Sequence, residues 1–543
     1  MNSNFRSYLI IFLLAVILFM PFLGQVHLFD WDEVNFAEAA REMIVTHNYT
    51  TVQIDFKPFW EKPPLFFWFQ VAAMKMFGIN EFAARLPNAI AGMLTLMFLF
   101  YIGEKHFDKK FAWLWVVVYM SSFLPFLYFK SGIIDPWFNL LIFSGIYFLI
   151  FAGKNDKRKY LNTALSAALI GLATLTKGPV AILLTGLTYF ISLLINRFRN
   201  FLSVRQILLY LGVFSAIGGL WFIILIVQGH SEIIREFIVY QIRLLTTEDA
   251  GHGGPFYYHF LVLLLGCFPM SVFAFRGFKK QADSKLLSEQ QSYFRQWMLI
   301  LFWVVLILFS IVKTKIVHYS SLAYFPLSFL AVYGILQLFE KGKIGNWIKT
   351  GIIIIATLLG TAIALMPFVE KYKTWIIAKG WIHDPFAVAN LQATVQWSYL
   401  VTIIGISFVL GTLAVVIFVR DVKKSVLVIS LISLITIEVA SLEIVPRIEP
   451  YSQGPAIAFY QSLKGKDVFV VPLGFKSYAH LFYSEKQSAT AKAQPATDIL
   501  LRGKIDKPAY FVSKITRKDE ILNSYPLLEV LYQKNGFVFY RRK

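Results

Sequence analysis

The sequence predicts an α-helical polytopic membrane protein with a small α/β domain at its C-terminal end. Of the 543 residues, 57% are hydrophobic and only 15% are charged. Apolar runs close to the length of a membrane-spanning helix recur up to residue 445. After residue 446 the apolar runs become short and are separated by turn residues, a pattern typical of strands and short helices.

The apolar runs predict about thirteen transmembrane helices. The first run follows Arg6 and resembles a signal peptide, but no small-residue cleavage site follows it, so we expect an uncleaved first helix. The runs are residues 8–26, 84–103, 111–129, 134–152, 160–176, 179–196, 206–228, 256–275, 296–312, 318–339, 350–368, 397–419 and 424–445.

Basic residues predict the orientation of these helices. The net charge is +20, and the lysines and arginines concentrate in every second loop between apolar runs. The positive-inside rule places these loops and the N-terminus in the cytoplasm, and an odd number of spans then places the C-terminus outside. The charge therefore indicates membrane topology and contact with anionic lipid, not binding to nucleic acid.

Residues 1–445 are expected to form the transmembrane domain, with three external loops at 27–83, 229–255 and 369–396. Within the first loop, residues 31–43 and 64–77 are expected to be interfacial helices that lie on the membrane.

Residues 446–543 are expected to form a small extracytoplasmic α/β domain. Strands are predicted at 467–471 and 510–512, and a hairpin at 527–532 and 537–540 around Lys534-Asn535-Gly536. Helices are predicted at 451–463 and 478–486.

Six polar motifs lie at the ends of apolar runs, and the predicted topology places all six on the external side. Gathering carboxylates and cations on one face is unexpected for a protein that only crosses a bilayer, and it indicates an enzyme with one extracytoplasmic active site. The motifs are Asp32-Glu33, Glu61-Lys62-Pro63-Pro64, Asp135, Lys177-Gly178-Pro179, the stretch from Arg243 to Tyr258, and Lys313 to Tyr319.

Most of these motifs also have a structural explanation. Asp30 and Glu33 fit a capping box, and Asp135 before Pro136 fits a helix N-cap. Lys177-Gly178-Pro179 fits a helix stop. Lys62 fits a side chain that reaches toward the headgroups.

The remaining motifs have open alternatives as well. Lys313, Lys315 and Tyr319 either hold phosphate oxygens or anchor a helix among headgroups. Tyr257 belongs to an aromatic stretch that suits the interface. Glu61 and His252 are weak candidates for a shared divalent metal, and no cofactor is otherwise required.

Taken together, the motifs resemble the polyprenyl-phosphate-dependent glycosyltransferases of the GT-C fold, over residues 1–330. The resemblance is greatest to bacterial aminoarabinose transferases of lipid A and extends to the protein O-mannosyltransferases. It rests on Asp32-Glu33 with the following Phe36 to Met43, on Glu61-Lys62-Pro63-Pro64, on Glu81 to Pro87, on Thr176-Lys177-Gly178-Pro179, and on His252-Gly-Gly-Pro255-Phe256-Tyr257-Tyr258.

The resemblance implies roles for these residues in moving a sugar from a polyprenyl-phosphate donor by direct, inverting transfer. Asp32 corresponds to the catalytic base and Asp135 to a second acid, with Glu33 beside them. Lys62 and Arg243 correspond to donor-phosphate ligands, and Lys177, Lys313, Lys315, Tyr319 and Tyr257 are further candidates. The family's aminoarabinose transferases carry a histidine near the arginine, whereas this chain has Tyr240-Gln241-Ile242-Arg243.

The implied partners are the lipid-linked donor, membrane lipid, and a glycolipid, glycan or protein acceptor. The implied location is the bacterial inner membrane, with the active site on the periplasmic side. The main alternative is a transporter or flippase of lipid-linked sugars, which would place ionisable residues on broken helices near the bilayer midplane. A non-enzymatic scaffold of the envelope accounts poorly for six motifs on one face.

Overall fold

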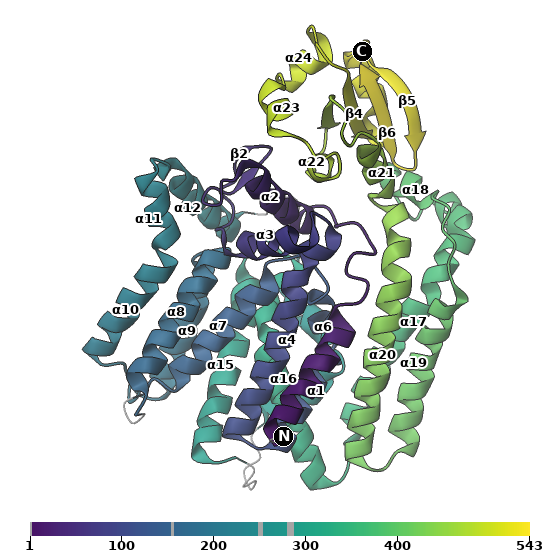
Figure 1. Ribbon diagram of the computed structural model, residues 1–543. Coiled ribbons are helices and arrows are strands. Elements are labelled where there is room, and N and C mark those ends of the chain that lie inside the picture. Colours follow the sequence, from purple (N-terminus) through teal and green to yellow (C-terminus); the bar gives the residue numbers. More distant parts are fainter. Residues whose placement is uncertain (1–2, 154–156, 248–252, 280–286, 543) are drawn as a thin grey trace.

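The computed structural model describes residues 3–153, 157–247, 253–279 and 287–542. Most of the chain forms a bundle of roughly parallel helices, called here the helical body (Figure 1). Its elements are α1 (Ser3–Phe19), α4 (Glu81–His106), α5 (Lys109–Met120), α6 (Phe123–Tyr128), α7 (Asp135–Ile150), α8 (Lys159–Lys177), α9 (Val180–Ile195), α10 (Val204–Gly218), α11 (Leu220–Val227), α13 (Tyr258–Gly266), α14 (Met270–Phe278), α15 (Glu289–Ile311), η1 (Val317–Ala323), α16 (Tyr324–Lys341), α17 (Asn346–Ala378), α19 (Tyr399–Phe418) and α20 (Val422–Ile448).

Each predicted apolar run coincides with one of these helices or with a pair of consecutive helices. Within the described residues, six helices are long and apolar enough to cross a membrane, or up to eight if each of two bent pairs is one span. The pairs are α10 with α11, bent by 52°, and α13 with α14, bent by 113°. The protein is therefore a multi-pass membrane protein.

Small residues let some helices of the body approach closely. A Cβ atom added to Gly277 of α14 would lie 1.9 Å from the carbonyl oxygen of Leu330 in α16, and one added to Gly334 would lie 2.4 Å from the oxygen of Phe273. Lipid tails are as apolar as the side chains, so helix association in a membrane depends on such close packing. This contact fixes α16, and with it η1, against α14.

A second layer covers one end of the body, which we call the cap end. It contains α2 (Asp32–Thr46), the short hairpin β1 (Gln53–Ile54) and β2 (Lys57–Pro58), and α3 (Leu65–Phe77). These elements lie across the ends of the body helices, whereas the N-terminus lies at the opposite end (Figure 1). The layer matches the helices predicted at 31–43 and 64–77. However, α2 is buried from Glu33 to Met43 and does not lie on a surface.

The other predicted external loops contain helices as well. Residues 229–255 include α12 (Ser231–Thr246), and residues 369–396 include the end of α17 and α18 (Pro385–Leu391). The sequence analysis described 229–255 as a loop, but Ile233, Phe237 and Tyr240 are spaced as one helical face and are buried.

Residues 446–543, called the tail, carry a four-stranded sheet and several short helices beyond the cap end (Figure 1). The strand order is β3-β4-β6-β5, with β3 parallel to β4 and the other pairs antiparallel. The elements are η2 (Glu449–Tyr451), α21 (Gly454–Ser462), β3 (Phe469–Leu473), α22 (Ala479–Tyr483), α23 (Ser488–Ala493), α24 (Thr497–Arg502), β4 (Ala509–Lys514), η3 (Ile515–Arg517), α25 (Lys518–Ser524), β5 (Glu529–Lys534) and β6 (Phe537–Arg542).

Polar contacts fasten the tail to α2 and the segment before it. His27 bonds to Glu449, the backbone amide of Leu28 donates to the hydroxyl of Tyr483 at 2.7 Å, and Arg41 donates to the carbonyl of Lys486 at 2.9 Å. Arg41 is itself paired with Glu38 at 2.6 Å, and both side chains are almost fully buried. Separating a buried ion pair leaves an uncompensated charge in the protein interior, which is strongly unfavourable. These contacts therefore hold the tail at a fixed place over α2.

Candidate active site

A cavity of about 580 Å³ opens at the cap end of the body. It is bounded by α2 and the segment before it, the residues before α3, the start of α7, the end of α8, α12, η1 and one loop of the tail. Its polar lining consists of Asp30, Asp32, Glu33, Asn35, Glu61, Lys62, Asp135, Lys177, Tyr240, Arg243, His318, Tyr319 and Lys476.

Asp32 is the first residue of α2 and is the more open of the two predicted catalytic acids. Its side chain is 41% exposed, whereas that of Asp135 is 5% exposed. The predicted capping box is wrong. Trp31 is the N-cap residue, with φ of 74° and no side-chain cap, while the carboxylate of Asp30 accepts a bond from the amide of Trp31. Burial raises the pKa of Asp30 above its ordinary value.

Asp135 starts α7 and is held by a cation from the neighbouring helix. The helix begins at Asp135 and its N-cap residue is Ile134, so the side chain does not cap the helix as one alternative predicted. Lys177 Nζ, at the end of α8, lies 2.6 Å from Asp135 Oδ1. This pair leaves the second carboxylate oxygen of Asp135 facing the cavity.

The helix stop after Lys177 also shapes the cavity. Gly178 adopts a φ of 100°, a conformation that L-residues rarely tolerate, and a Cβ there would lie 2.7 Å from the ring of Phe237 in α12. The structural explanation of Lys177-Gly178-Pro179 is consistent with the turn at Gly178, and the same turn places Lys177 beside Asp135.

His318 connects the two aspartates. Its Nε2 lies 3.5 Å from Asp32 Oδ2 and 3.7 Å from Asp135 Oδ2. The 3-10 helix η1 that carries it is fixed to the body, since Ser321 accepts a bond of 2.7 Å from Asn139. The imidazole of His318 therefore lies between the two carboxylates and connects the element that carries Asp32 with the one that carries Asp135.

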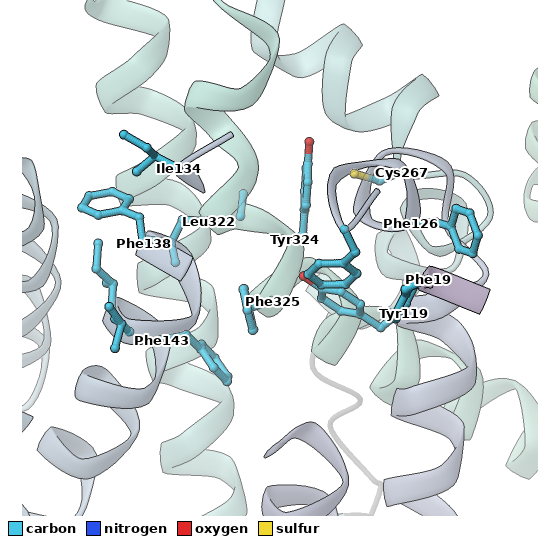
Figure 2. Close-up of a cluster of buried hydrophobic side chains, with 14 of the residues drawn as sticks. Phe19, Tyr119, Phe126, Ile134, Phe138, Phe143, Cys267, Leu322, Tyr324 and Phe325 are labelled. Carbon is cyan, nitrogen blue, oxygen red and sulfur yellow. The ribbon is translucent and has the colours of Figure 1, made fainter. Parts of the chain in front are cut away.

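Packing beneath the cavity fixes the relation between α7 and η1. Figure 2 shows Ile134, the residue before α7, and Phe138 of α7 on the same side as Leu322 of η1, with Phe325 and Phe143 further down. The rings of Phe143 and Phe325 stack with centroids 4.4 Å apart. Offset ring pairs of this kind have a defined geometry, so the helices carrying Asp135 and His318 are set in one register.

Glu33 lines the cavity but is fully engaged in holding its walls together. It pairs with Arg85 at 2.7 Å and accepts bonds from the amides of Phe29 and Gly132. Burial alone would raise the pKa of Glu33, but Arg85 and these amides outweigh it and keep the pKa below its usual value. Its geometry is that of a residue that positions α2 against the loop before Asp135.

Two further cations share one aromatic ring. The Nζ of Lys62 and the guanidinium carbon of Arg243 each lie 5.1 Å from the ring centroid of Tyr240. Burial lowers the pKa of Lys62, and Glu61 opposes that effect only in part. An anion beside Lys62 and Arg243 would therefore favour the charged form of Lys62, which burial disfavours.

The remaining predicted residues divide into two groups. Tyr319 lines the cavity, with Lys177 Nζ 5.0 Å from its ring centroid. Lys313 and Lys315 lie outside it and line a separate cavity of about 710 Å³. Lys315 is turned back to donate to carbonyls at the end of α15, including that of Ser310 at 2.6 Å. Tyr257 does not line the cavity and is 60% exposed.

Of the two candidate metal ligands, Glu61 and His252, the structure describes only Glu61. Glu61 lines the cavity, 3.9 Å from Lys476, and His252 lies outside the described residues. Within the described part of the chain, no three His, Cys, Asp or Glu side chains lie together as a metal site would require.

The sequence analysis assigned no role to His318, Tyr240 or Lys476, all of which line the cavity. His318 was part of the motif from Lys313 to Tyr319, but it lies in the 3-10 helix η1, which begins at Val317 after both lysines. Tyr240 lies on the buried face of α12. Lys476 has no signal in the local sequence.

Comparison with known proteins shows which families and folds the chain resembles. The sequence model of the dolichyl-phosphate-mannose-protein mannosyltransferase family matches residues 61–226. An undecaprenyl phosphate-alpha-4-amino-4-deoxy-L-arabinose arabinosyl transferase of Wigglesworthia glossinidia brevipalpis is 26% identical over 355 residues, and one of Shewanella sediminis is 26% identical over 391. The matches span 63% and 69% of this chain, and this chain covers 60% and 70% of the two relatives.

The structural match extends over nearly the whole chain. The crystal structure of ArnT from Cupriavidus metallidurans bound to undecaprenyl phosphate superimposes with a TM-score of 0.77 at 18% identity, covering 98% of each chain. The predicted resemblance to the polyprenyl-phosphate-dependent glycosyltransferases of the GT-C fold is thus confirmed, and this chain has that fold.

Proposed function

We propose that this protein is an integral membrane glycosyltransferase that moves a sugar from a polyprenyl-phosphate donor to an acceptor outside the cytoplasm. The observation that carries the proposal is the convergence of two aspartates, bridged by His318, with Lys62 and Arg243 in one cavity. The related arabinosyl transferases, named for an undecaprenyl phosphate-linked sugar, support the donor class.

The reaction we propose is a direct displacement. An acceptor hydroxyl attacks the anomeric carbon of the donor sugar, and the bond from that carbon to the phosphate oxygen breaks with its electron pair leaving on the phosphate. Asp32 takes the hydroxyl proton, so the products are the glycosylated acceptor and polyprenyl phosphate. An acceptor that is itself an ionised phosphate would attack without passing a proton to Asp32.

The roles follow from burial and charge. Asp32 is exposed to the cavity and acts as the base, whereas Asp135, pinned by Lys177, orients the acceptor or His318. Lys62 and Arg243 stabilise the charge that develops on the departing phosphate, since cations fixed in a partly dry site need no reorganisation. Glu33 positions these groups and does not take part in the chemistry.

A long apolar groove is the proposed place for the prenyl chain. It has a volume of about 770 Å³ and runs between α9 and α15, where Trp303 and Ile307 are partly exposed. Ile311 lines both this groove and the cavity that contains Lys313. This continuity supports Lys313 as a cation near the path of the lipid phosphate, whereas the ammonium of Lys315 is bonded to carbonyls at the end of α15.

The topology we propose has thirteen crossings, with the cap end and the tail on the periplasmic side of the inner membrane. The basic connections, such as that between α16 and α17, support this orientation because they lie at the same end as the N-terminus (Figure 1). The tail then forms a small extracytoplasmic α/β domain, separate from the transmembrane domain of residues 1–445.

Single-cysteine labelling tests the orientation. In a chain with Cys267→Ser, Lys343→Cys in the connection after α16 and Lys492→Cys in the tail place one exposed thiol at each end. An impermeant maleimide should label only position 492 in intact spheroplasts and both positions after lysis. Labelling of position 343 from outside would overturn the orientation.

A turnover assay tests the activity. Purified protein is incubated with a radiolabelled polyprenyl-phosphate sugar and envelope lipids, glycans and proteins as acceptors. Release of polyprenyl phosphate with label in an acceptor fraction is the expected result. Movement of intact donor between leaflets of a proteoliposome, without release of polyprenyl phosphate, would instead identify a flippase, which the clustering of ionisable residues at one end does not favour.

A further inference from the structure

The loop that follows β3 brings a residue of the tail into the candidate active site. Lys476 lines the cavity together with Asp32, Lys62 and Arg243. Its Nζ lies 5.8 Å from the ring centroid of Trp31, 5.4 Å from that of Tyr478, and 3.9 Å from a carboxylate oxygen of Glu61. Lys476 is thus the contribution of the tail to the polar lining of the cavity.

The wall that carries Lys476 is firmly built. The side chain of Gln453 accepts a bond from the amide of Asp30 at 2.8 Å and donates to the carbonyl of Leu28 at 2.8 Å. Ser477 and the backbone of Tyr478 bond to the carboxylate of Asp30. The two residues that follow Lys476 are therefore tied to the segment before α2, which holds this loop of the tail at the cavity.

The distribution of charge in the cavity separates Lys476 from the other cations. Lys177 is paired with Asp135, and Lys62 and Arg243 share the ring of Tyr240 on the side of α12. Lys476 lies on the wall formed by the tail, near Glu61, and its side chain is 53% exposed. Its distance to Glu61 is at the limit of an ion pair, so the ammonium keeps most of its capacity to bind an anion.

The aromatic ring beside Lys476 narrows the kind of ligand. Trp31 is 44% exposed and presents a flat apolar face next to the ammonium. An exposed indole face suits a sugar ring, and a lysine suits a phosphate or carboxylate as a compact point charge. Together they fit an acidic saccharide better than a neutral one.

We propose that Lys476 binds an anionic group of the acceptor, so that the tail supplies the acceptor specificity of the site. This inference rests on the proposed function, because it takes the Lys62 and Arg243 side for the donor phosphate. The acceptor then lies in the cavity with its acidic group on Lys476, its sugar ring against Trp31 and its hydroxyl at Asp32.

Binding of a simple acidic sugar to the lipid-loaded protein tests the inference. The full chain is saturated with undecaprenyl phosphate to occupy the donor-phosphate position, and glucosamine 1-phosphate is titrated by calorimetry with glucosamine as the neutral twin. Wild type should bind the phosphorylated sugar more tightly than the neutral one. Lys476→Ala should weaken that binding about tenfold or more, because a charge-assisted contact is lost, and Lys476→Arg should retain most of it.

Controls distinguish this role from a general effect on the tail. Lys492→Ala removes an exposed lysine of the same tail and should leave both sugars unaffected. Affinity for undecaprenyl phosphate should be unchanged in Lys476→Ala. The inference is overturned if wild type fails to prefer the phosphorylated sugar, if Lys476→Ala binds it as wild type does, or if that variant loses undecaprenyl phosphate instead.

The same measurements separate this inference from the proposed function. Wild-type protein that releases no polyprenyl phosphate from any labelled donor, but still binds glucosamine 1-phosphate through Lys476, would refute the glycosyltransferase and leave the anion site standing. Turnover by the wild type, together with unchanged binding of glucosamine 1-phosphate in Lys476→Ala, would support the glycosyltransferase and refute the anion site.

Discussion

At the scale of single residues, the candidate site depends on which carboxylates remain open to the cavity. Asp32 is 41% exposed, whereas Asp135 is pinned by Lys177 and Glu33 by Arg85. The resemblance already ranked Asp32 as the base and Asp135 as a second acid, but the sequence did not show what holds Glu33. Its partner Arg85 lies 52 positions away, and the contact leaves no trace in the local pattern.

Asp32→Asn should abolish transfer while leaving donor binding intact. The amide cannot accept the proton of the acceptor hydroxyl, and a general base typically contributes about 10²–10⁴-fold in rate. Turnover and the affinity for a donor analogue are measured on the same preparation. Asp498→Asn, at an exposed position in the tail, is the matched control. A variant at position 32 that keeps more than half of the wild-type rate would show that Asp32 is not the base.

Lys62→Ala and Arg243→Ala should weaken donor binding as well as turnover, because the phosphate is charged before and during the reaction. Each lost charge-assisted contact should cost roughly 1.5–3 kcal/mol. Because the pKa of Lys62 is lowered, donor affinity of the wild type should begin to fall with rising pH below 10.5, and Lys62→Arg should remove that dependence. Unchanged donor affinity in both alanine variants would contradict the assignment.

At the scale of elements, the sequence predicted helices well where one apolar run makes one helix. It missed α12 because its residues are amphipathic and its charged positions suggested a loop. It left Lys315 between a phosphate ligand and a helix anchor, because it could not show that the end of α15 leaves carbonyls to which the side chain of Lys315 donates. The bent pairs are read from sequence as single spans, since a break of a few residues does not interrupt the apolar run.

Gly277→Val should destabilise the protein and reduce activity together. The added side chain would meet the backbone of Leu330, which cannot move without shifting α16 and the η1 segment that carries His318. Overpacking of this kind costs roughly 1–3 kcal/mol or more. The apparent unfolding temperature in detergent measures it. Gly212→Val, at a helical position with open space around it, should behave as wild type. Equal stability of the two variants would argue against close packing of α14 on α16.

At the scale of the whole molecule, the tail and the segment before α2 are joined by a pH-dependent contact. The hydrogen bond to Glu449 raises the pKa of His27 above 6.5, and partial burial opposes this. A raised histidine pKa means that the folded state binds the proton more tightly than the unfolded state. The contact therefore stabilises fully below pH 6.5 and is lost as pH rises through the raised pKa.

His27→Gln should accordingly destabilise the protein most in acidic buffer, with the difference from wild type shrinking as pH rises. Apparent unfolding temperatures across a pH series give the comparison, and His383→Gln, at an exposed position between α17 and α18, is the control. If the difference in unfolding temperature instead grows with pH, protonated His27 paired with Glu449 does not stabilise the folded state.

The order in which the chain is made gives the tail contacts a further consequence. Leu28 and Tyr483 are 455 positions apart, and Arg41 and Lys486 are 445 apart. Helices enter the membrane from the N-terminal end, so α2 is made early. The tail residues that cover it are made only near the end of synthesis. A chain that ends before the tail lacks the carbonyl of Lys486 and the hydroxyl of Tyr483, so Arg41 and the segment before α2 lose these bonds. The first wall of the cavity is therefore made near residue 30 and secured only by the last hundred residues.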